Sequence, residues 1–74
     1  MITPRKRLDC MILAAMTPES EYTVADMLEV FDDKTNQQVR GSFMRLTSMG
    51  AVETITRENG LPALYRLIPE KVGA

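Results

Sequence analysis

Apolar residues at helical spacing predict a first helix near the N-terminus. Its stripe consists of Leu8, Met11, Ile12 and Ala15. Thr3 suits the N-cap position and Pro4 the first helical position, so we expect the helix to begin there. It should end before Pro18, because a residue that precedes proline is pushed out of the helical region.

A second helix is predicted by a complete core-facing stripe with the spacing i, i+3, i+4 and i+7. The stripe consists of Val24, Met27, Leu28 and Phe31. We expect Thr23 to cap this helix after a short extended segment over 21–23. Asp26 then places negative charge in the first turn, where the helix dipole favours it. Asp32 and Asp33 end the apolar run.

A third helix is predicted over about 35–49. Thr35 and Gln38 fit a capping box, in which each side chain accepts a hydrogen bond from the backbone amide of the other residue. The buried seam of this helix consists of Val39, Phe43, Leu46 and, near its end, Met49. Gly50 suits the residue that terminates the helix.

After the third helix the pattern becomes that of a β-hairpin. Segments 51–56 and 63–68 are rich in β-branched and other apolar residues. Between them, Asn59 and Gly60 both tolerate the positive φ that a type I′ turn requires, and this pair is a strong hairpin signal. The tail 70–74 is expected to be loose.

This order of elements predicts a single α+β domain over 1–74, with its core at about 4–68. The chain's 74 residues are near the lower limit for a self-sufficient core. That core must rest on Leu, Ile, Val and the six Met residues, because the chain has no Trp and few other aromatics. We therefore expect a homodimer, joined through the first helix or the chain ends.

Two passages of this sequence resemble the winged helix-turn-helix superfamily. Residues 23–28 (TVADML) are similar to the T-V-A-D-L entry of a helix-turn-helix. Residues 39–52 (VRGSFMRLTSMGAV) are similar to the V-R-x-x-L-x-R-L-x-x-x-G-L-V passage from recognition helix into wing, and 65–67 (YRL) to the return strand. The resemblance covers roughly 8–67 and is of the bacterial and phage transcription-regulator type. It implies three helices, a C-terminal hairpin wing, and a third helix that enters the major groove.

Charge is sorted along the chain, although the formal net charge is only −1. Residues 19–33 carry acids and no base, whereas 34–52 carry bases and no acid. This distribution predicts one acidic and one basic face. It favours DNA as a partner of the third helix, while the low total charge leaves open a protein partner on the acidic face of the second helix.

The candidate DNA-binding residues on the third helix are polar, basic or small. They are Thr35, Asn36, Gln37, Gln38, Arg40, Gly41 and Arg45. Asn and Gln can pair with adenine and Arg with guanine, so this set is able to read base edges. The alternative is an ordinary solvated helix face. Glycine inside an exposed helix costs about 1 kcal/mol relative to alanine, so Gly41 indicates close approach of DNA, tight packing against the second helix, or a glycine that is merely tolerated there.

Four further basic residues are candidates for phosphate contacts. Arg5 and Lys6 can act as an N-terminal arm on the DNA backbone, or simply as a solubilising end. Arg57, and with it Arg66, can reach DNA from the wing, unless the hairpin serves only to cover the core.

Enzymatic chemistry is not expected. The chain has no histidine and a single cysteine, Cys10, so a Cys/His zinc site lacks ligands and a catalytic thiol lacks a base. No cofactor or metal is predicted. Without a signal peptide or a bilayer-spanning stretch, we expect a cytoplasmic protein. Two functions remain: a DNA-binding transcriptional regulator, and a winged-helix protein-interaction module that does not touch DNA.

Overall fold

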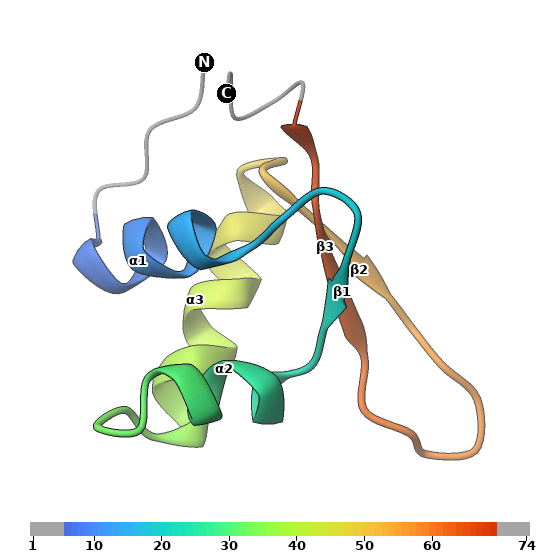
Figure 1. Ribbon diagram of the computed structural model, residues 1–74. Helices are drawn as coiled ribbons and strands as arrows, with labels where there is room; N and C mark the ends of the chain where they lie inside the picture. The colour runs from blue at the N-terminus through green and yellow to red at the C-terminus, as the bar shows by residue number, and fades with distance from the viewer. Residues whose placement is uncertain (1–5, 70–74) are drawn as a thin grey trace.

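The computed structural model describes residues 6–69, which form three helices and a three-stranded antiparallel sheet (Figure 1). The predicted α+β class is confirmed. The elements are α1 (Arg7–Ala15), β1 (Glu21–Tyr22), α2 (Val24–Val30), α3 (Asn36–Ser48), β2 (Val52–Ile55) and β3 (Leu64–Leu67). In the view of Figure 1, α3 lies between α1 and the sheet, and α2 lies at the N-terminal end of α3. The expectations for Arg5 and for the tail 70–74 lie outside the described residues.

The first helix begins later than its sequence predicts. Lys6 has extended φ and ψ and is the N-cap of α1, so the predicted start at Thr3 and Pro4, which lie outside the described residues, is wrong. The Lys6 side chain makes no capping bond. Asp9 in the first turn is buried against α3, where it is bonded to Arg45.

The ends of the other two helices follow the local chemistry. Thr23 Oγ1 accepts a hydrogen bond from the Asp26 amide at 3.1 Å, and the Thr23 amide donates to Asp26 Oδ2 at 2.9 Å. Thr35 and Gln38 form the same reciprocal pair at 3.1 and 2.9 Å, which confirms the predicted capping box. Gly50 follows α3 with a φ of +81°, as a helix-terminating residue requires.

The core lies where the helices meet the sheet. Its buried apolar residues are Ile12, Met16, Met27, Val39, Phe43, Leu46, Ala51, Val52 and Leu67. The predicted seam of α3 is therefore confirmed, and the other three members of the α2 stripe pack against the core while partly exposed. Two polar residues, Asp9 and Ser42, are buried with it.

The sheet has the order β1-β3-β2 and is antiparallel throughout. The hairpin strands end at the pair Ile55 and Leu64, so the connection runs over 56–63. Within it, Asn59 and Gly60 have φ of +61° and +72°, which confirms positive φ at the predicted turn. The strands stop short of that turn, and the predicted segments 51–56 and 63–68 are each a little too long. None of the helices within residues 6–69 has the length and apolar content needed to cross a bilayer.

Candidate nucleic-acid interface

The outward side of α3 carries a shallow hollow of about 500 Å³. The residues that line it are Asn36, Gln37, Arg40, Gly41 and Met44. They lie opposite the buried seam because helical periodicity places residues 37, 41 and 44 about half a turn from 39, 43 and 46. Met44 is 67% exposed, and Asn36, Gln37 and Arg40 are exposed as well. We call these five residues the α3 face.

The polar side chains of the α3 face are available to a partner. Within residues 6–69, no hydrogen bond or ion pair involves the side chains of Asn36, Gln37 or Arg40. Thr35 and Gln38 differ from them, since their side chains are occupied in the capping box. The structure thus divides the helix candidates into residues that fix the start of α3 and residues that point outward from it.

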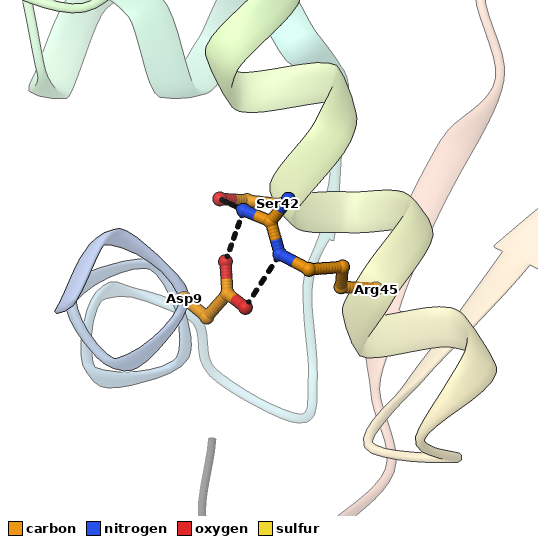
Figure 2. A network of polar contacts seen from close by, with 3 residues as sticks. All are labelled: Asp9, Ser42 and Arg45. Atoms are coloured by element: carbon orange, nitrogen blue, oxygen red, sulfur yellow. Dashed lines mark hydrogen bonds and ion pairs between the residues drawn. The ribbon is translucent and has the colours of Figure 1, made fainter. Parts of the chain in front are cut away.

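Arg45 occupies a third position, between α3 and α1. Its Nε donates to Asp9 Oδ2 and its Nη2 to Asp9 Oδ1, each at 3.0 Å, and Nη2 also donates to Ser42 Oγ at 3.1 Å (Figure 2). The Asp9 side chain is only 2% exposed, whereas that of Arg45 is 46% exposed. Hydrogen bonding to the Asp9 carboxylate raises the pKa of Arg45 above its already high ordinary value, so the guanidinium remains cationic.

Asp9 is the residue of this site that sequence reasoning missed. Its position was visible as an acid on an otherwise apolar helix, flanked by Leu8 and by buried Ile12 one turn later. A buried carboxylate requires a charged or hydrogen-bonding partner. The sequence alone does not name that partner, because Arg45 is far away along the chain.

Gly41 has an open environment. A Cβ atom built at Gly41 would meet only Arg45 Nη1, at 3.5 Å, which is an ordinary van der Waals separation. Tight packing against α2, one of the three explanations that the sequence leaves open, is therefore wrong for the described chain, and close approach of DNA and a merely tolerated glycine remain. The cost of glycine at this helical position is not offset by any contact among residues 6–69.

The basic residues of the hairpin are largely engaged. Arg57 Nε donates to the Pro62 carbonyl at 2.8 Å, which braces the connection between the strands. Arg66 pairs with Glu53 across the sheet, with Nη2 and Oε2 2.6 Å apart. Leu61, next to the turn, is 53% exposed.

The start of α1 carries exposed basic side chains. Lys6 and Arg7 are both exposed, and Lys6, the N-cap of α1, lies three residues before Asp9. Because Asp9 is bonded to Arg45, the Asp9 side of α1 lies against α3, whereas Arg7, two residues before Asp9, lies on the opposite side of the helix. Arg5 lies outside the described residues.

Every acidic side chain over 19–33 is exposed. These residues are Glu19, Glu21, Asp26, Glu29, Asp32 and Asp33. Val30, next to Glu29 in the chain, is 60% exposed. We call these six exposed acids, together with Val30, the acidic surface.

Neither metal-binding side chains nor related proteins narrow the function of this chain further. Within residues 6–69, no three side chains of the types that bind metals gather at one place. Comparison of the chain with protein-family models, curated proteins and solved structures finds no match in any of the three.

Proposed function

We propose that this chain is a sequence-specific DNA-binding protein of the winged helix-turn-helix type, a transcriptional regulator that reads the major groove with α3. The order of helix, short strand, two helices and hairpin supports this proposal. So does the capped turn between α2 and α3, which sets the two helices of a helix-turn-helix against one another.

One observation carries the proposal. The α3 face presents an amide, a second amide and a guanidinium that have no partner within residues 6–69, on a helix without an acidic residue. Asn36 and Gln37 can pair with adenine, and Arg40 with guanine O6 and N7. A helix of this diameter fits the major groove of B-DNA.

The remaining candidates have supporting roles in this account. Lys6, with Arg5, contacts phosphates, and such contacts fix the register of the protein without reading sequence. Thr35 and Gln38 hold the start of α3, so that its exposed residues meet the bases at a fixed angle. Arg57 braces the hairpin, which serves as the wing. Binding and release of DNA need no catalytic residue or cofactor, so the proposed regulator is not an enzyme.

Selection of duplexes from a random-sequence pool tests the proposal. The parent protein should enrich a consensus, and a homodimer should enrich one with two-fold symmetry and half-sites about one helical turn apart. Arg40→Ala should lose the preference at one position of each half-site. A pool that remains random after repeated selection by the parent protein would contradict sequence-specific binding.

A second function is favoured by the acidic surface. Val30 is a large apolar residue that is 60% exposed next to exposed Glu29 in the chain, and an apolar residue beside an acidic one suits a basic protein partner better than DNA. In that account the chain is an interaction module that does not touch DNA. Val30→Ser together with Glu29→Lys would then abolish its activity in the cell, whereas Arg40→Ala would not. The DNA-binding proposal predicts the reverse.

A further inference from the structure

We infer that Arg45 does not read bases but binds a phosphate of the DNA backbone beside Gly41, held in position by Asp9 and Ser42. This inference rests on the proposed function and deepens it. It assigns the chemistry of one contact on the edge of the α3 face, and it gives Gly41 a role that no contact in the described chain supplies.

The guanidinium nitrogens of Arg45 do not all have partners. Nε and Nη2 of Arg45 are directed at Asp9 and Ser42, which leaves Nη1 without a partner within residues 6–69 (Figure 2). A guanidinium that has two nitrogens fixed by a carboxylate has lost most of its rotational freedom. Its remaining N–H donors therefore have a set direction before any ligand arrives, which lowers the entropy cost of binding.

Positive charge remains accessible at the Asp9–Arg45 pair. Asp9 is buried while the Arg45 side chain is nearly half exposed, so the pair shows its cationic side to solvent. Lys6, the exposed N-cap residue of α1, lies three residues before Asp9. A phosphate oxygen is a good acceptor for a guanidinium N–H in such a setting, because the hydrogen bond is charge-assisted.

Open space lies beside Nη1 of Arg45. Gly41 has no side chain, and the nearest heavy atom to an added Cβ would be Nη1 itself, at 3.5 Å. The glycine thus leaves the helix backbone open directly next to the unused donors. A phosphate group can approach there as closely as the backbone of α3 permits, and an alanine methyl group would occupy part of that space.

The test uses the full chain and two duplexes of equal length, one selected from a random pool by the parent and one of random sequence. Arg45→Lys retains a cation that can pair with Asp9, but its single ammonium cannot also reach a phosphate beside Gly41. We expect Kd to rise about tenfold for both duplexes, and the slope of log K against log salt to become shallower by about 0.9. Gly41→Ala should weaken both duplexes while raising Tm by about 4 °C, since alanine favours the helix.

Ser48→Ala is the matched control, because Ser48 is exposed on the same side of α3 two turns further on. It should leave affinity and salt slope unchanged. If Arg45→Lys and Gly41→Ala both bind as the parent does, or if Arg45→Lys changes sequence preference and not the salt slope, the inference is wrong. Arg40→Ala in the same series separates this failure from that of the proposed function. If Arg40→Ala still loses its preference for the selected duplex, the proposal that α3 reads bases stands. If the parent protein binds neither duplex, both the inference about Arg45 and the proposed function fail.

Discussion

The ring of Phe43 on α3 stacks on the ring of Tyr65 on β3, with centroids 4.0 Å apart and planes inclined by 3°. Phe43 is fully buried and belongs to the core, so the stack connects α3 directly to the central strand of the sheet. The position of the hairpin relative to α3 therefore depends on this pair.

We predict that Tyr65→Leu destabilises the protein by about 1–2 kcal/mol, through loss of the aromatic pair and of buried area. For a domain of this size that corresponds to a fall in Tm of roughly 5–15 °C, measured by circular dichroism. Tyr65→Phe keeps the ring and is the control. Equal melting of Tyr65→Leu and the parent would show that the stack does not support the sheet.

The Asp9–Arg45 pair should show energetic coupling. Arg45→Ala leaves a buried carboxylate without its bidentate partner, and we expect it to cost about 2–3 kcal/mol, less than for a fully buried pair because Arg45 is half exposed. A double-mutant cycle with Asp9→Ala, followed by urea unfolding, should give a coupling energy of about 1–2 kcal/mol. Strict additivity of the two single changes would mean that the pair does not hold α1 on α3.

The turn at the end of the hairpin should be sensitive to backbone strain alone. Gly60 has a φ of +72°, and beyond its two chain neighbours no heavy atom lies within 4 Å of an added Cβ, so the Cβ of Gly60→Val has open space. A β-branched residue at positive φ should nevertheless cost about 1 kcal/mol or more. Gly60→Asn is the control, because asparagine tolerates this conformation. An unchanged Tm for Gly60→Val would contradict the turn.

Self-association remains a prediction from the small core. We expect a homodimer in which the first helix contributes, since Ile12 is the only large apolar residue of α1 that is fully buried among those described. Light scattering at high micromolar concentration should report twice the mass of the chain, and Met11→Glu, at a half-buried position of α1, should shift it to the monomer. A monomer for the parent protein at that concentration would overturn this expectation.

The parts of the fold that depend on local chemistry follow from the sequence. The cap at Thr35, the helix end at Gly50 and the positive φ of Asn59 each involve residues within a few positions of one another. The start of α1 at Lys6 is not predicted, and Asp9 in its first turn is bonded to Arg45 on a different helix, a contact that local sequence does not indicate. Local preference is a weak guide wherever a buried charge needs a distant partner.

Sequence likewise predicts only part of the candidate site. Helical spacing is sufficient to place Gln37, Arg40 and Gly41 on one outward side. It cannot distinguish Arg40, which has no polar partner in 6–69, from Arg45, which is held by Asp9, because the two differ only in tertiary contacts. Nor can it separate the three explanations of Gly41, since packing against α2 is a property of the folded chain.

The central claim, that α3 reads base edges, is tested most directly by one set of affinities. Kd is measured at physiological salt for the parent, Gln37→Ala and Arg40→Ala on the selected duplex and on a random duplex, with Lys6→Ala as the phosphate-contact control. We predict that each α3 variant loses roughly 1–3 kcal/mol on the selected duplex and little on the random one, whereas Lys6→Ala weakens both alike. Parent-like affinity of both α3 variants for the selected duplex would contradict the account.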